Sequence, residues 1–238
     1  MPQTTQNRLL ALMPPDERRY VLEQAVEVPF KYKMALYVAG RSIEHVYFPI
    51  EGVASLVNTM KDGSAAEVGT IGNEGLVGIP VILGDRSAPT DIYMQVEGKG
   101  LRLPAPVLTS LLDRSPNVRK LMLHYVHAVF NQVAQSAACL HFHHIDQRAC
   151  RWILMTHDRV QTDSFSLTQD FLAMMLGVRR SSVTDAAQQL KKRGLINYSR
   201  GHVTILDRLG LERSACECYQ VSKQEFDRLL CFPDAPRE

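Results

Sequence analysis

The chain has 238 residues, of which 45% are hydrophobic and 22% charged, so it is long enough for two globular domains of ordinary size. Its formal net charge of +2 excludes a polycation, and its apolar runs are too short to span a bilayer. The chain does not open on a secretion leader, and its five cysteines are scattered. We therefore expect a soluble cytoplasmic protein with reduced thiols.

Short helices are expected before a long β-rich region. Residues 7–13 are amphipathic and end at two prolines, and residues 16–26 predict a helix with an acidic first turn. From residue 28 to residue 103, runs of Val, Ile, Tyr and Phe are separated by turn residues, of which Asp62–Gly63 is the clearest hairpin signal. This pattern predicts an all-β barrel or sandwich.

Three helical segments are expected next, over residues 104–114, 116–139 and 141–158. Apolar residues cover so much of the 116–139 helix that we expect it to pack both on its own barrel and on a second copy of the chain. The alternative is a helix that is buried entirely within one chain. The residues expected to form the dimer helix are Leu121, Met122, Tyr125, Val129 and Val133.

A helix–turn–helix is predicted over residues 168–194, after a polar connector at residues 159–166. Gly177 lies where the turn needs a positive φ, and small Ala173 before it leaves room for the two helices to cross closely. An ordinary helical hairpin in a core is the alternative, but it does not require a polar outer face. That face carries the predicted DNA-reading residues Arg179, Arg180, Ser181, Ser182, Thr184, Asp185 and Gln188.

A β-hairpin is predicted directly after these helices, from residues 195–198 and 203–206, which makes the motif winged. Residues 168–213 contain eight basic and four acidic residues, and this local charge of +4 suits contact with phosphates or a solvated face. Residues 207–231 are expected to close the chain in helical pieces. The predicted phosphate and wing contacts are Thr168, Gln169, Lys191, Arg200, Gly201 and His202.

These elements together resemble the Crp–Fnr superfamily of bacterial transcription regulators. The resemblance rests on LYVAGRSIEHVYFPIEGVASLV and VGTIGNEGLVGIP in the first half, and on LTQDFLAMMLGVRRSSV and GLINYSRGHVTILD in the second. It implies an α+β fold with a cyclic-nucleotide-binding-like β-roll sensor domain (1–115), a dimerisation helix (116–140) and a winged helix–turn–helix domain (141–238). It also implies a homodimer on a pseudo-palindromic site, with double-stranded DNA, a second copy and RNA polymerase as partners.

The predicted effector pocket departs from the family pattern. Members that bind cyclic nucleotides carry a Gly-Glu-Leu triplet that holds the ribose and, further on, an Arg-Ser or Arg-Thr that grips the phosphate. The triplet aligns here with Gly78, Ile79 and Pro80, which puts an isoleucine in place of the carboxylate. A phosphate without an Arg partner would lose its hydration without compensation. We therefore expect no control by a cyclic nucleotide, unless an insertion lets Arg86 and Ser87 turn into the pocket.

The recognition helix also departs from its relatives. By resemblance, Arg180 matches the Arg that reads guanine, whereas Ser181 and Asp185 stand where nucleotide-responsive members carry a Glu and a further Arg. Arg180 therefore remains suited to guanine, and Asp185 can accept a hydrogen bond from a cytosine amine. We expect a base preference that differs from that of those members.

Two groups of metal-ligating side chains occur outside these motifs. The stretch CLHFHHIDQR, which is the expected hinge between the two long helices, contributes one group, and a Cys-x-Cys pair near the end contributes the other. We expect no metal in either, because adjacent donors need a partner to complete the shell and a one-residue spacer is unusual for zinc. A redox-active thiol in the Cys-x-Cys pair is the alternative. The residues are Cys139, His141, His143, His144, Cys216 and Cys218.

We expect neither a cofactor nor an enzyme. Oxygen-sensing relatives bind an iron–sulfur centre through N-terminal cysteines, whereas the first cysteine here is Cys139. The chain has no Walker A loop, GxSxG elbow or HExxH helix. The alternative to a DNA-binding regulator is a ligand-responsive or protein-docking module whose winged helix binds a protein.

Overall fold

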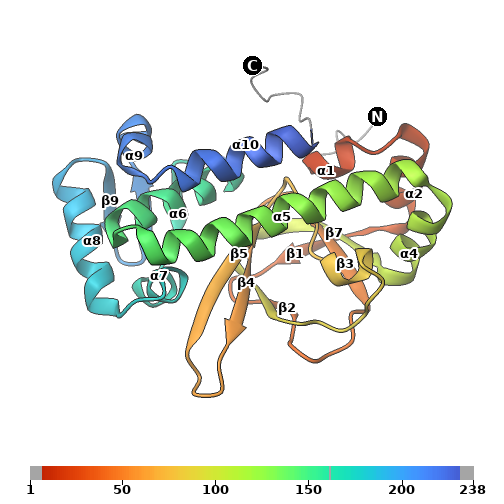
Figure 1. The fold of residues 1–238 in the computed structure, drawn as a ribbon, viewed down its shortest axis with the longest axis horizontal. Helices are drawn as coiled ribbons and strands as arrows, with labels where there is room; N and C mark the ends of the chain where they lie inside the picture. The colour runs from red at the N-terminus through yellow and green to blue at the C-terminus, as the bar shows by residue number, and fades with distance from the viewer. Residues whose placement is uncertain (1–6, 161, 231–238) are drawn as a thin grey trace.

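The computed structural model describes residues 7–160 and 162–230, and its first half is a roll of two antiparallel sheets (Figure 1). The strand order is β1–β7–β3 in one sheet and β2–β6–β4–β5 in the other. These sheets confirm the predicted β-rich half. The strands are β1 (Val26–Phe30), β2 (Ala35–Tyr37), β3 (His45–Pro49), β4 (Val53–Thr59), β5 (Ala65–Ile71), β6 (Asp91–Val96) and β7 (Gly98–Pro104).

Two local predictions in this half need correction. The Asp62–Gly63 hairpin is present between β4 and β5, but its loop runs from Met60 to Ser64 and is not a two-residue turn. The helix expected to reach residue 26 ends at Gln24, because Val26 already pairs with Arg102 as the first residue of β1. The short helices of this half are α1 (Arg8–Ala11), α2 (Pro15–Gln24), α3 (Ile79–Ile82) and α4 (Ala105–Arg114).

The long helix α5 (Pro116–Phe142) lies against the roll (Figure 1). Three residues of the predicted dimer helix, Met122, Tyr125 and Val129, are at most 3% exposed and belong to the core of their own chain. The Tyr125 hydroxyl donates to the Leu76 carbonyl at 2.8 Å. These three side chains therefore form the part of the helix that packs on its own roll, as expected for one of its two faces, and they are not available to a partner.

A second apolar face of α5 remains exposed. Leu123 and Phe130 keep 46% and 68% of their surface, and they belong to a row spaced alternately by four and three residues. Such alternation keeps one stripe along one side of a helix. The exposed stripe consists of Leu123, His127, Phe130, Ala134, Ala137 and His141.

Helix α6 (Ile145–Val160) follows α5 after a break at His143 and His144, inside the predicted hinge. Cys139, the first residue of the predicted hinge stretch, is buried with 1% exposure near the end of α5. Helix α6 is tied to the roll, because Trp152 donates from Nε1 to Glu67 Oε1 at 3.1 Å and Arg159 pairs with Glu74 at 2.7 Å.

The second half has a hydrophobic core of its own and a three-stranded sheet of order β8–β10–β9. Strand β8 (Ser164–Ser166) lies in the segment that was predicted to be a connector, and Phe165 pairs with Val203. The predicted connector is therefore wrong for residues 164–166. Three residues are too few to show the alternation typical of a strand, and they form one because they pair with β10. The other elements are α7 (Gln169–Leu176), α8 (Arg180–Lys192), β9 (Ile196–Ser199), β10 (His202–Ile205) and α9 (Arg208–Ser214).

The last helix, α10 (Cys218–Leu230), lies along α5 (Figure 1). Its Phe226 and Leu230 are buried in the core of the roll, so the segment expected to form the DNA-binding domain returns to the sensor half. Cys231, the expected end of the final helical piece, lies outside the described residues. Among the residues that the structure describes, no helix is both long and apolar enough to cross a membrane.

Candidate nucleic-acid interface

Local capping sets the geometry of the α7–α8 pair. The Thr168 hydroxyl accepts a hydrogen bond from the Phe171 amide at 3.2 Å and begins α7 as its N-cap. Gly177 ends α7 in the left-handed conformation with φ of 59°, as the sequence predicts. Val183 is fully buried behind the turn, so the inner face of α8 packs on α7 and its outer face remains free.

The outer face of α8 carries the predicted DNA-reading residues with different degrees of exposure. Ser182 and Thr184 are half-buried, and the Thr184 hydroxyl donates to the Arg180 carbonyl at 3.2 Å. Thr184 therefore already satisfies its donor within its own helix. The exposed members of the set are Arg179, Arg180, Ser181, Asp185 and Gln188.

The wing is a tight hairpin between β9 and β10. Arg200 and Gly201 occupy its two turn positions with φ of 49° and 78°, the pair of positive values that a type I′ turn requires. The Gly201 carbonyl accepts from the Leu167 amide at 2.7 Å, and the Tyr198 hydroxyl donates to the Leu167 carbonyl at 2.9 Å. These bonds fix the wing tip beside the start of α7.

The two helices and the wing enclose an open groove of about 490 Å³. Five predicted residues line it (Thr168, Gln169, Arg180, Arg200 and Gly201), together with Asp170, Tyr198 and Ser199. The last three were not predicted, because no local pattern distinguishes them from other surface residues. Eight predicted residues do not line this groove: Arg179, Ser181, Ser182, Thr184, Asp185, Gln188, Lys191 and His202.

Arg180 is held at the mouth of the groove by weak contacts. Its Nε donates to Gln169 Oε1 at 3.2 Å, and its Nη1 lies 3.3 Å from Asp170 Oδ1. The side chains of Arg180 and Asp170 are 64% and 72% exposed, so solvent screens the pair and its net contribution is small. The guanidinium can therefore exchange these partners for a base or a phosphate at little cost.

The sensor half contacts the start of α7. The Tyr32 hydroxyl lies 3.5 Å from the Thr168 hydroxyl, and its ring centroid lies 6.4 Å from that of Phe171. Thr168 was predicted to face phosphates, but it is partly covered by the roll in this arrangement. The sequence offers no signal for this contact, which joins residues 136 positions apart.

The residues predicted to form a degenerate effector pocket do not converge. Gly78 has a φ of 157°, and a Cβ there would lie 2.6 Å from Val46 Cγ1. Ile79 begins α3 and packs against the core of the roll, while Pro80 is half-buried. Arg86 and Ser87 are exposed on a loop that bridges to Ser42.

Comparisons with known proteins agree with both halves of the fold. Residues 27–115 match the cyclic nucleotide-binding domain, and residues 147–214 match the Crp-like helix-turn-helix domain. A comparison with curated protein sequences gives no match.

Several solved structures share the fold at low sequence identity. A Crp/Fnr-family regulator from Eubacterium rectale is 16% identical with a TM-score of 0.68, over 88% of this chain and 98% of its own. FixK2 from Bradyrhizobium japonicum is 14% identical with a TM-score of 0.70, over 81% and 98%. A CRP-family regulator from Thermus thermophilus is 18% identical with a TM-score of 0.66, over 79% and 96%.

A β-roll sensor domain joined by a long helix to a winged helix–turn–helix defines the class of DNA-binding transcription regulators with a built-in sensor. The two domain matches lie in the order and at the positions that the fold gives them. The chain belongs to the Crp–Fnr family of transcription regulators, and these proteins are not enzymes.

Proposed function

We propose that the chain acts in the cytoplasm as a homodimer that binds a pseudo-palindromic DNA site and is not controlled by a cyclic nucleotide. The groove between α7, α8 and the wing carries this proposal, because Arg180 and Arg200 meet there beside the capped start of α7. Arg180 reads a guanine edge, and Arg200 at the wing tip contacts a phosphate. The remaining exposed residues on α8, with Asp185 among them, tune the base preference.

The exposed stripe on α5 supports the dimer. Leu123 and Phe130 expose apolar surface on a helix whose opposite face is already buried in the roll. Alternating spacings of four and three residues suit packing against the same stripe of a second copy. A parallel pair of α5 helices would present two recognition helices related by a two-fold axis, as a pseudo-palindromic site requires.

The contacts between α5 and β5 support independence from cyclic nucleotides. Gln132 Oε1 accepts from the Thr70 amide at 2.7 Å, and Gln132 Nε2 donates to the Thr70 carbonyl at 3.3 Å. Helix α5 is therefore held on strand β5 by hydrogen bonds of the chain itself, and it needs no bound nucleotide to position it there. In addition, Ile79 cannot accept a hydrogen bond from a ribose hydroxyl, and Arg86 is exposed on a surface loop. Titration calorimetry with cyclic AMP and cyclic GMP tests this part, and micromolar binding of either nucleotide would overturn it.

Selection of genomic fragments by the purified chain, without added ligand, tests DNA binding. We expect one enriched pseudo-palindrome and an affinity that falls steeply with salt, because bound phosphates release their counterions. Arg180→Ala should cost about 1–3 kcal/mol on this site and relax the preference at one base pair. Arg200→Ala should weaken all sequences alike.

Arg41→Ala is the matched control for these variants, because Arg41 is an exposed arginine of the sensor half. It removes the same charge and should leave the preference unchanged. An Arg180→Ala protein that keeps its base preference would contradict the assigned docking.

We further propose RNA polymerase as the partner of the DNA-bound dimer. The competing function is a module whose winged helix docks on a protein. Salt distinguishes the two, since protein docking gives neither an enriched sequence nor the steep salt dependence of phosphate contacts.

A further inference from the structure

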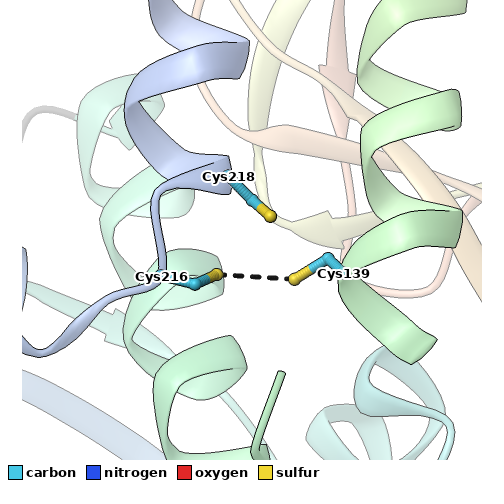
Figure 2. A group of neighbouring side chains, drawn as sticks. All are labelled: Cys139, Cys216 and Cys218. Atoms are coloured by element: carbon cyan, nitrogen blue, oxygen red, sulfur yellow. Dashed lines mark hydrogen bonds between the residues drawn. The ribbon is translucent and has the colours of Figure 1, made fainter. Parts of the chain in front are cut away.

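Three cysteines from distant parts of the chain meet next to the hinge. Cys139 lies near the end of α5, Cys216 between α9 and α10, and Cys218 at the start of α10. Figure 2 shows the side chains of Cys139 on α5, Cys218 on α10 and Cys216 on the loop before α10 pointing toward one another. All three sulfur atoms lie within 4.8 Å of one another, and Cys139 Sγ is 3.5 Å from Cys216 Sγ. Each residue is at most 3% exposed.

These thiols are not simply small apolar residues of a core. Among the described residues, they form a buried cluster of their own, with no other buried hydrophobic member, and it is separate from the two main cores. Polar side chains reach the cluster as well: Gln135 donates from Nε2 to Cys218 Sγ at 3.0 Å. The cluster also holds three neighbouring thiols, whereas a disulfide needs only two. Buried polar surroundings and a third donor are features of a ligand set.

Positive charge lies beside the cluster. Arg151 on α6 is 6% exposed; its Nη2 donates to Ser136 Oγ at 3.0 Å, whereas its Nε has no hydrogen-bond partner among the described residues. Cys139 and Arg151 also line one cavity of about 40 Å³, together with Arg148. Two guanidinium groups thus stand where anionic sulfur would otherwise be uncompensated.

We propose that Cys139, Cys216 and Cys218 bind one thiophilic d¹⁰ metal ion, Zn²⁺ or Cu⁺, as thiolates. Zinc–sulfur bonds of about 2.3 Å place the sulfurs of one tetrahedral site about 3.8 Å apart, which small rotations of these side chains reach. Hard ions such as Mg²⁺ and Ca²⁺ need oxygen donors, which this set lacks. On binding, the thiol protons pass to solvent, and Arg148 and Arg151 offset the remaining negative charge.

His143 provides the means to distinguish the two ions. It follows Cys139 by four residues, and its Nε2 lies 3.5 Å from Glu217 Oε1, whose residue separates the other two cysteines. A tetrahedral zinc site of three cysteines and one histidine would use it as fourth ligand. Cuprous ion binds to thiolates without it. His143→Ala should therefore weaken Zn²⁺ binding at least about tenfold and leave Cu⁺ binding unchanged.

The site would join the end of α5 to the start of α10, directly before the break at His143 and His144. An ion there holds the winged-helix half in one orientation relative to α5. Together with the proposed function, on which this step rests, this means that metal occupancy changes the affinity for DNA. Metal can change the DNA affinity in this way only if two orientations of the winged-helix half bind the ion with different affinity.

Metal binding is tested on the full chain, reduced and stripped of metal under anaerobic conditions. Native mass spectrometry and competition with a chromophoric chelator should give one ion per chain, with thiol protons lost. Cys139→Ser, Cys216→Ser and Cys218→Ser should each weaken binding more than about 100-fold. Cys150→Ser is the matched control, because Cys150 is fully buried outside the cluster and should leave binding unchanged.

Two outcomes would overturn the site: no stoichiometric ion, or equal affinity in the cluster variants and the control. Trp152 fluorescence checks that each variant is folded, and Cys216→Ala provides a second substitution where the serine disturbs packing. The regulatory step is measured separately, as the change in DNA affinity on adding the ion to the wild type and to Cys218→Ser. Stoichiometric metal with unchanged DNA affinity would refute the regulation alone, whereas loss of DNA binding with and without metal would refute the proposed function.

Discussion

The buried ion pair between Glu74 and Arg159 gives a sharp test of how the two halves are joined. Arg159 donates from Nε to Glu74 Oε1 at 2.9 Å, its Nη2 lies 2.7 Å from the same oxygen, and both side chains are 9% exposed. The Gly72 amide also donates to Glu74 at 3.2 Å. The arginine stem fills the space beside Gly72, where a Cβ would lie 2.7 Å from Arg159 Cδ.

Arg159→Met keeps most of the stem volume and removes the charge, which leaves the Glu74 carboxylate buried without its partner. Breaking a buried pair in this way should lower the free energy of unfolding by about 3–5 kcal/mol. Glu74→Gln combined with Arg159→Met removes the stranded charge and keeps an acceptor for Gly72. The double variant should therefore recover about 2 kcal/mol relative to Arg159→Met.

Urea unfolding followed by tryptophan fluorescence measures the change in the free energy of unfolding with a probe that lies in the interface itself. Trp152 is the only tryptophan of the chain, and its Nε1 donates to Glu67 in the same interface between α6 and the roll. Arg119→Met is the control, since Arg119 pairs with Asp113 at 3.0 Å while both side chains are more than half exposed. That substitution should change stability by less than about 1 kcal/mol. A double variant no more stable than Arg159→Met would refute the reasoning.

Two further predictions concern Glu67 and the exposed stripe. Burial raises the pKa of Glu67 to about 8. Between pH 4.5 and pH 8 the folded chain therefore keeps a proton on Glu67 that the unfolded chain has released. As the pH rises through this range, Glu67 should lower the free energy of unfolding by about 1.4 kcal/mol per pH unit. Glu67→Gln should remove that slope, and equal slopes in urea unfolding of wild type and variant from pH 5 to 8 would contradict it. Phe130→Glu puts a charge into the exposed stripe and should weaken self-association at least about tenfold in sedimentation equilibrium. Leu209→Glu alters an exposed leucine outside the stripe, 64% exposed on α9, and should leave association unchanged; equal association of both variants would refute the stripe as the dimer contact.

Local patterns were sufficient for the recognition unit. The left-handed Gly177 and the wing hairpin each depend on residues within a few positions of one another, so the sequence predicts them directly. The β-rich half was predicted for the same reason, from turn residues between short apolar runs. Strand β8 was missed because three residues acquire strand geometry only by pairing with β10.

The two apolar faces of α5 show where local reasoning ends. Apolar residues cover both faces, so the sequence indicated that this helix meets two neighbours but not which face meets which. Packing on the roll buries Met122, Tyr125 and Val129, and it leaves Leu123 and Phe130 outside. The return of α10 to the same core adds Phe226, which no pattern near residue 226 reveals.

The sequence by itself determined the order of the domains and the winged recognition unit, and its family resemblance predicts that Ile79 replaces a ribose-binding carboxylate. Interactions between neighbours along the chain, or single residue identities, decide each of these. Only the tertiary structure decided that Cys139 meets Cys216 and Cys218, that Tyr32 covers Thr168, and which face of α5 is free. Such contacts join residues far apart in sequence, and long-range packing alone selects them.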